Sequence, residues 1–216
     1  MTPNKYEERI LGYIDVLGWS SLINQSTTDQ AIITELLEAL DLTRRDLENQ
    51  PHLHLVQVTH FSDHVCISCP ATMKHAIAAI SIVLGSMTLK LLEKGFPVRG
   101  ALVAGPLIHS GTRILGPALI EAHEIESRVA KYPRIVLSDR AVGYALLCRD
   151  DRLFPQDADG LTFLDVFAPL DTDEEIEAIR TAIVKRGAMQ ETLDFRSKKC
   201  WLLNQLRRRQ AALKSA

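Results

Sequence analysis

The order of the expected strands and helices indicates an α+β fold: a mostly antiparallel sheet carries helices on one face, and C-terminal helices follow. Short apolar runs typical of strands come in pairs joined by tight turns, as in hairpins. Long segments with apolar residues at helical spacing separate these runs. Beyond residue 170 the patterns are helical. We therefore expect one domain over 1–170 and a helical extension over 171–216, packed on the same domain.

Strands and helices alternate through the first 170 residues. The expected strands lie at 10–16, 53–59, 65–69, 97–104, 107–115, 134–138 and 161–167. The expected helices lie at 29–48, 71–94, 117–131 and 139–147. Thr28 and Asp139 are expected to cap the first and last helix, Gly95 ends the second, and Pro117 takes the favoured first position of the third. The sheet face without helices would take a ligand or a second subunit.

Composition points to a soluble globular protein, because 46% of the 216 residues are hydrophobic and 24% are charged. The net charge of −2 provides no general attraction for nucleic acid or an acidic membrane. The apolar stretch 76–87 is too short to span a bilayer, and charges at 7–9 interrupt any signal peptide. The basic run 207–209 is typical of a solvated helix end. We expect a cytoplasmic protein.

The C-x-x-C pair, Cys66 and Cys69, is compatible with zinc or redox chemistry, but its position favours buried structural thiols. Both cysteines lie on one expected strand, where positions three apart point to opposite faces. A zinc site needs two further ligands nearby. His60 and His64 flank the same hairpin, and we expect them to point away from each other.

Two carboxylates stand out, one in the first expected strand and one in the hairpin that follows it. Asp15 breaks an apolar strand, where an unpaired carboxylate is costly, although an Asp can also cap a turn at a strand end. Asp63 lies in the hairpin link, where Asp is a common turn residue. The first strand and this hairpin should be neighbours, so the two carboxylates can converge. Paired carboxylates are typical ligands of Mg²⁺ or Mn²⁺.

The segment after Asp15 allows contact with phosphate. Gly18 permits a sharp turn, and the backbone amides of 17–20 would then face phosphate oxygens at a helix N-terminus. A plain strand-to-helix connection would have the same sequence. Arg99 lies on an apolar strand, where it either faces phosphate or pairs with an acid.

Four motifs in order resemble class III adenylate and guanylate cyclases. Residues 12–19 resemble the metal-binding strand, 60–63 the hairpin with the second metal Asp, 98–105 the R-x-G-x-x-x-G strand, and 116–122 the glycine and catalytic helix. The resemblance covers about 10–138. The combination F-S-D, R-G-x-x-x-G and G-P-A-L-I-E-A-x-E-x-E most resembles the compact pyrimidine cyclases of the Pycsar anti-phage system.

This resemblance implies a class III cyclase-like sandwich with a ferredoxin-like sheet. It also implies a homodimer with active sites at the subunit interface. Two divalent ions, Mn²⁺ or Mg²⁺, would be held by Asp15 and Asp63 with the carbonyl of Val16. The implied substrate-binding residues are Tyr13, Gly18, Trp19, Ser20, Thr59, Arg99 and Arg113.

The chain differs from the purine cyclases in the residues that contact the base and in those that stabilise the transition state. Thr59 stands where those enzymes carry a base-reading Lys, and Arg113 falls at their second base-reading position. Their transition-state Asn and Arg fall near Ile120 and Glu124. Arg128, one turn later, is the substitute catalytic candidate, or else a solvated partner of Glu124.

The resulting hypothesis is an enzyme that converts UTP, or CTP, to the 3′,5′-cyclic monophosphate and pyrophosphate. By the Pycsar resemblance the product would be a second messenger that acts on a separate effector protein. The alternative is a catalytically inactive cyclase-like domain that binds a nucleotide and regulates a partner. A diguanylate cyclase is disfavoured because the chain lacks the G-G-D-E-F hairpin.

Overall fold

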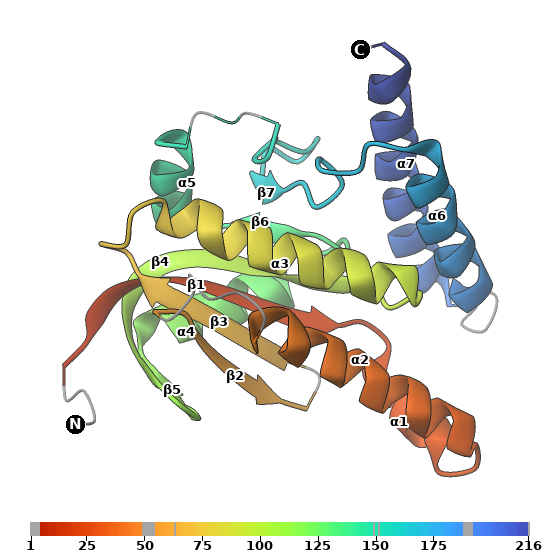
Figure 1. The fold of residues 1–216 in the computed structure, drawn as a ribbon, viewed down its shortest axis with the longest axis horizontal. Helices are drawn as coiled ribbons and strands as arrows, with labels where there is room; N and C mark the ends of the chain where they lie inside the picture. Colours follow the sequence, from red (N-terminus) through yellow and green to blue (C-terminus); the bar gives the residue numbers. More distant parts are fainter. Residues whose placement is uncertain are drawn as a thin grey trace.

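The computed structural model describes residues 5–48, 55–62, 64–148, 150, 152–187 and 192–215. Within them, a seven-stranded sheet has the strand order β2-β3-β1-β4-β6-β7, and β5 pairs with the end of β4 (Figure 1). The strands are β1 (Glu7–Val16), β2 (Gln57–Phe61), β3 (His64–Pro70), β4 (Val98–Ser110), β5 (Arg113–Leu115), β6 (Ile135–Leu137) and β7 (Phe163–Leu164).

The central strand β1 pairs with β3 and β4, and every pair of neighbours is antiparallel except β4 and β6. The expected α+β fold with a mostly antiparallel sheet is therefore confirmed. The register places Asp15 beside His64 of β3 on one side and Arg99 of β4 on the other. Three charged or polar side chains from three strands thus meet at one end of the sheet.

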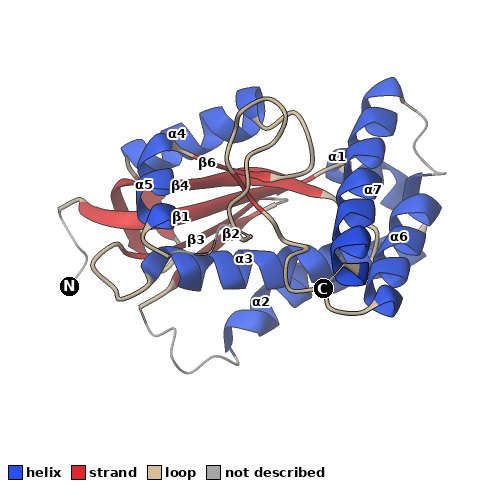
Figure 2. Cartoon of the chain, turned by 90° about the horizontal axis from the view of Figure 1, so that it is seen from above, coloured by secondary structure: helices blue, strands red, loops and turns tan. Residues whose placement is uncertain are grey.

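The expectation that the domain's helices cover one face of the sheet is wrong for one helix. Helices α3 (Ala76–Glu93) and α5 (Asp139–Leu146) pack with Ile10 and Ile14 of β1. Helix α4 (Pro117–Glu124) packs with Leu11 and Tyr13 on the opposite face, and Figure 2 shows α3 and α4 on the two sides of the sheet. Alternate residues of β1 point to opposite faces, and both sets are apolar, so both faces need a cover.

Helix α3 packs closely against the sheet at Gly12. A Cβ atom built there would lie 2.4 Å from Leu84 Cδ1, so a larger residue would force Leu84 to move. Among the described residues, α3 alone is long and apolar enough to cross a membrane, although the sequence pattern suggested a shorter stretch. Its packing on the sheet, with 61% of that stretch buried, is typical of a core helix. The helix begins at Ala76, five residues later than expected.

The connection after β1 contains a helix that the sequence pattern did not predict. Gly18, with φ of 82°, precedes α1 (Trp19–Ser26), and α2 (Gln30–Glu48) follows. Trp19 is buried against Phe96, so α1 forms through packing of a few apolar residues. The predicted Thr28 cap is wrong: the Ala31 amide donates to Asp29 Oδ1 at 2.9 Å, whereas Thr28 donates to the carbonyl of Gln25.

Strand β4 runs unbroken to Ser110, so the expected turn before residue 107 is wrong, and the turn lies at Gly111. The reason is long-range pairing: Pro106 and Leu107 lie opposite Glu8 and Glu7, which extend β1 further than expected. The helix expected over 117–131 is two segments, α4 and the π-helix η1 (Ile125–Val129). Ser138, not Asp139, caps α5.

Among the described residues, the regular elements that follow β7 are two helices, as expected: α6 (Asp173–Gly187) and α7 (Leu193–Lys214). They share an apolar cluster with Leu92 of α3, Phe167 and Leu170. In Figure 1 they stand together beside the C-terminal end of α3. The boundary near residue 170 stays a prediction.

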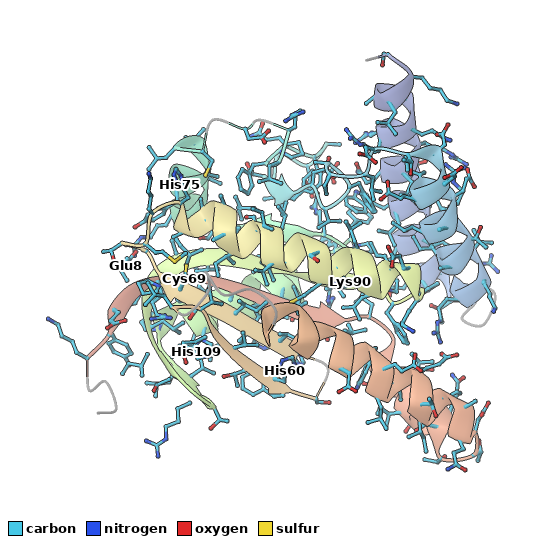
Figure 3. All side chains as sticks on the ribbon, in the orientation of Figure 1. Glu8, His60, Cys69, His75, Lys90 and His109 are labelled. Atoms are coloured by element: carbon cyan, nitrogen blue, oxygen red, sulfur yellow. The ribbon has the colours of Figure 1, made fainter. Side chains whose placement is uncertain are left out.

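The cysteine prediction is confirmed. Cys66 and Cys69 are buried on opposite faces of the sheet, and Cys69 lies between the sheet and α3 (Figure 3). Burial raises the pKa of Cys66 to about 12 and that of Cys69 to about 11, which keeps both as unreactive thiols. His60 pairs with Val65 in the ladder and His64 with Phe61, so the two histidines point to opposite faces.

Candidate active site

Asp15 lies near the end of β1 in a cluster of charged and polar side chains. Only 9% of the residue is exposed. Its Oδ1 lies 3.6 Å from His64 Nε2, and its Oδ2 lies 3.4 Å from Arg99 Nε. The strand pairing of β1 with β3 and β4 brings these side chains together. Asp15 is therefore a carboxylate with a cation beside it, as the anomaly in the sequence suggested.

Arg99 links Asp15 to a second carboxylate, Glu126. The distance from Arg99 Nε to Glu126 Oε1 is 2.5 Å, but the N–H does not point along this line, so the contact is an ion pair rather than a directed hydrogen bond. Glu126 is 2% exposed, and its Oε2 lies 3.8 Å from His123 Nδ1. Of the two possibilities for Arg99, phosphate contact or pairing with an acid, the structure shows pairing, with both Asp15 and Glu126.

Sequence reasoning missed Glu126, although a signal was present. Ala118, Ala122, Glu126 and Ala130 recur every four residues, and all four are buried. This spacing exceeds the 3.6 residues of an α-turn, and the chain accommodates it by changing to the π-helix η1. Single π-turns occur often at functional sites. The wide turn places an acid where a small residue would otherwise face the sheet.

Tyr13 is 6% exposed and lies beneath two imidazole rings. Its ring centroid lies 5.3 Å from that of His64 and 6.1 Å from that of His123. Contact between Tyr13 and a substrate would require these rings to move. Tyr13 therefore supports the two histidines that lie against Asp15 and Glu126.

Fewer backbone amides than expected are available in the segment that was predicted to bind phosphate. The Leu17 amide donates to the carbonyl of Pro97 at 2.8 Å, so it is not available to a ligand. The side chains of Val16 and Trp19 lie in an apolar cluster, which leaves only their backbone groups for contact. Gly18 and the exposed Ser20 begin α1, whose first amides lack partners within the helix.

Thr59 belongs to a second, largely buried polar network. Its hydroxyl donates to the carbonyl of Gly111 at 2.8 Å, so it accepts from His109 Nε2 at 2.9 Å. His109 Nδ1 then accepts from the Ser68 hydroxyl at 2.7 Å, and Arg9 Nε donates to Ser68. Burial, with the charge of Arg9, lowers the pKa of His109 to about 4, consistent with this neutral tautomer. Figure 3 shows His109 on the side of the sheet away from α3.

This network holds the β4–β5 hairpin against β2. Besides Thr59, Gln57 Oε1 accepts from the Gly111 amide at 3.1 Å. Arg113 is exposed two residues beyond this contact. Thr59, which stands at the position of the base-reading Lys, thus contacts the hairpin that carries Arg113, and its hydroxyl hydrogen has a partner inside the chain.

The substitute catalytic candidate, Arg128, and the two positions where the family carries its transition-state Asn and Arg are all exposed. Arg128 is exposed on η1, and Ile120 and Glu124 are exposed on α4. Because η1 is π-helical, Arg128 does not share the α-helical register with Glu124 on which its assignment depended. Arg134 is buried and paired with Asp157 and Asp159, so it serves the structure rather than a substrate.

A divalent metal at this end of the sheet has one clear protein ligand. Asp15 offers the hard oxygen atoms that Mg²⁺ and Mn²⁺ prefer, and the site already attracts a cation, the guanidinium of Arg99. Asp63, the expected second ligand, lies outside the described residues. Among the residues that the structure does describe, no group of three His, Cys, Asp or Glu side chains could hold a metal. The donor chemistry at Asp15 fits a divalent metal ion, and the second ligand, Asp63, stays a prediction.

The fold is that of class III nucleotidyl cyclase domains. Solved structures similar to this chain include a double mutant of the guanylyl cyclase domain of the RhoGC fusion protein from the aquatic fungus Blastocladiella emersonii. That match has a TM-score of 0.56 and 12% identity over 76% of this chain and 96% of that one. A bacterial light-regulated adenylyl cyclase matches with a TM-score of 0.53 and 16% identity, over 82% and 99%.

A third similar structure is the guanylate cyclase domain of RhGC from Catenaria anguillulae in complex with GTP, with a TM-score of 0.52 and 12% identity over 74% and 96%. No protein-family model matches the sequence, and no curated protein matches it. The similarity therefore lies in the fold, and an activity has to be inferred from the residues around Asp15.

Proposed function

We propose that the chain is a nucleotidyl cyclase that converts UTP, or CTP, to the 3′,5′-cyclic monophosphate. The observation that carries the proposal is the position of Asp15, a nearly buried carboxylate at the end of β1 in a class III cyclase fold. In this reaction the 3′-oxygen forms a bond to the α-phosphorus. The bond from this phosphorus to the bridging oxygen breaks, and pyrophosphate leaves with the electron pair. The hydroxyl proton passes to solvent.

Asp15 and Asp63, with the carbonyl of Val16, would hold two divalent ions, Mn²⁺ or Mg²⁺. Such ions favour ionisation of a hydroxyl and neutralise phosphate charge. Arg99 fixes the Asp15 carboxylate, and Glu126 holds Arg99 from behind. The backbone amides of Gly18, Trp19 and Ser20, at the N-terminus of α1, would bind phosphate oxygens. Arg128 is the exposed cation proposed to stabilise the transition state.

The proposed assembly is a homodimer with sites at the interface. Arg128 is exposed, as is Arg113 on the β4–β5 hairpin, and both are accessible to a nucleotide held by a second chain. Solved structures of the Blastocladiella RhoGC domain include monomeric forms and a non-canonical dimeric form. A two-fold dimer is the commonest homo-oligomer.

The pyrimidine preference rests on Thr59 and Arg113. Thr59 is short and its hydroxyl hydrogen is used by Gly111, so it cannot replace the long base-reading Lys of purine cyclases. Arg113 carries only donors, which suit the 4-carbonyl of uracil better than the 4-amino group of cytosine. By the Pycsar resemblance, cyclic UMP would be a cytoplasmic second messenger of anti-phage defence and would act on a separate effector. Neither nucleic acid nor a membrane is a proposed partner.

One experiment tests the activity. The purified protein is incubated with Mn²⁺ and each of the four ribonucleoside triphosphates, and the products are identified by mass. Cyclic UMP, with less cyclic CMP and little purine product, is the expected result. Binding of a nucleotide without any cyclic product or pyrophosphate would refute catalysis and support the inactive regulatory domain.

A further inference from the structure

Helix α3 borders a cavity of about 710 Å³ that lies between this helix and the segment that follows β7. The opposite wall is formed by Leu153, Leu164, Asp165, Val166, Ala168 and Pro169. This volume falls within the range of small-molecule sites, roughly 300–1,000 Å³. Lys90, labelled in Figure 3, marks the part of α3 that lines the cavity.

Small residues of α3 create the space. Ala78, Ser81, Gly85 and Ser86 line the cavity. A glycine inside a helix lowers stability relative to alanine, yet a Cβ atom at Gly85 would meet nothing within 4 Å. Close packing therefore does not require glycine at this position. Ile82, which also lines the cavity, is 61% exposed, so an apolar surface is available at the rim.

A buried hydroxyl without a partner lies at the base of this cavity. Ser81 is 1% exposed, and within the described residues its Oγ has no hydrogen-bond partner. A buried polar group in this state is costly, and in native proteins such groups usually pair with a protein atom, a water or a ligand. Ser81 lines the cavity, and a rotation of its side chain towards the cavity would allow a bound molecule to supply the missing partner.

The charged groups that line the cavity restrict the charge of a ligand that can bind there. Glu93, Asp150 and Asp165 face it together with Lys90 and Arg152, and Arg152 pairs with Asp150, so the lining has no excess of positive charge. Burial raises the pKa of Asp165, which favours its neutral form. An anion would gain little here. A neutral, mostly apolar molecule with one hydrogen-bonding group matches both the apolar lining and Ser81.

We propose that this cavity, named here the α3 cavity, binds a neutral, mostly apolar small molecule that forms a hydrogen bond with Ser81. It lies across α3 from the strand that carries Asp15, so it is a site separate from the proposed nucleotide site. Its occupancy can be measured without any nucleotide or metal, so the outcome is independent of cyclase activity.

The probe is 1-naphthol, titrated into the full-length protein by isothermal calorimetry. Gly85→Leu fills the cavity and should abolish binding. Gly143→Leu is the matched control, because Gly143 is also a helical glycine with nothing within 4 Å, lies on α5 and does not line the cavity. It should leave affinity within about twofold. Ser81→Ala should weaken binding about five- to tenfold, the effect of one hydrogen bond.

Two further measurements sharpen the test. Ser81→Ala should raise the melting temperature of the ligand-free protein by about 2 °C, since it removes an unpaired buried hydroxyl. Naphthalene-1-sulfonate, the anion of the same ring system, should bind at least about tenfold more weakly than 1-naphthol. The proposal is overturned by 1-naphthol binding weaker than about 1 mM, by binding that persists in Gly85→Leu, or by equal binding of the anion.

Discussion

Replacement of Glu126 by Gln removes the buried charge that holds Arg99 while keeping the side chain's shape. Two unit charges about 4 Å apart attract by about 4 kcal/mol at an effective dielectric constant near 20. Breaking a buried pair costs about 3–5 kcal/mol. Arg99 is 24% exposed and keeps Asp15 at 3.4 Å, so part of this loss is recovered. We expect Glu126→Gln to lower the free energy of unfolding by about 2 kcal/mol.

A double-mutant cycle measures this interaction directly. Urea unfolding of the wild type, Glu126→Gln, Arg99→Gln and the double variant should give a coupling energy of about 2 kcal/mol. Glu38→Gln is the control, because Glu38 pairs with Lys94 at 2.8 Å with both side chains at least 40% exposed. This exposed pair should contribute under about 1 kcal/mol. A coupling between Arg99 and Glu126 as small as the control value would refute the reasoning.

Manganese binding provides a second readout of the same variants. Without the Glu126 charge, Arg99 has Asp15 as its remaining carboxylate, and it competes more strongly with a metal ion there. Glu126→Gln should therefore lower Mn²⁺ affinity in an electron paramagnetic resonance titration, and Arg99→Gln should raise it. A fall in both variants would show that Arg99 does not compete for Asp15.

Four further predictions concern the site and the fold. Asp15→Ala and Asp63→Ala should abolish cyclic product while the circular dichroism spectrum is kept, because each removes a metal ligand; near wild-type turnover in either would contradict the two-ion site. The protein should be a dimer at micromolar concentration by light scattering, and a fully active monomer would exclude an interfacial site. UTP should be cyclised in preference to CTP at equal concentration, and an unchanged ratio in Arg113→Ala would remove Arg113 from the base pocket. His109, with its pKa lowered to about 4 by burial, stays neutral in the folded chain while the unfolded chain takes up a proton below about pH 6.5. Stability should therefore fall by about 2–3 kcal/mol between pH 6.5 and 4, and His109→Gln should reduce this loss in urea unfolding.

The local sequence pattern was sufficient to predict several helices and strands. Helices α2 and α3 have enough apolar residues at helical spacing to be recognised without the fold, and the β2–β3 hairpin follows from two alternating runs around a tight link. The opposite faces of Cys66 and Cys69 follow from the two-residue period of a strand. Helix α1 was missed because it is only eight residues long, and contacts such as that of Trp19 with Phe96 stabilise it.

Pairing between strands explains why β4 is one continuous strand, although the sequence predicted two strands separated by a turn. The sequence around Pro106 suggests a turn, since Pro and Gly are frequent in turns. In the fold, the ladder between β1 and β4 continues through Pro106 and Leu107. That ladder depends on Glu7 and Glu8, about a hundred residues earlier in the chain, so no local window contains the information.

The sequence by itself determined the type of fold and identified Asp15 as a candidate, because a carboxylate inside an apolar strand is anomalous wherever that strand lies. Only the tertiary structure decided the surroundings of Asp15. Arg99 and Glu126 are distant in sequence, and their contact requires β4 beside β1 and a π-turn after α4. Charge interactions depend on distance and burial, and these two quantities exist only once the strands and helices have packed.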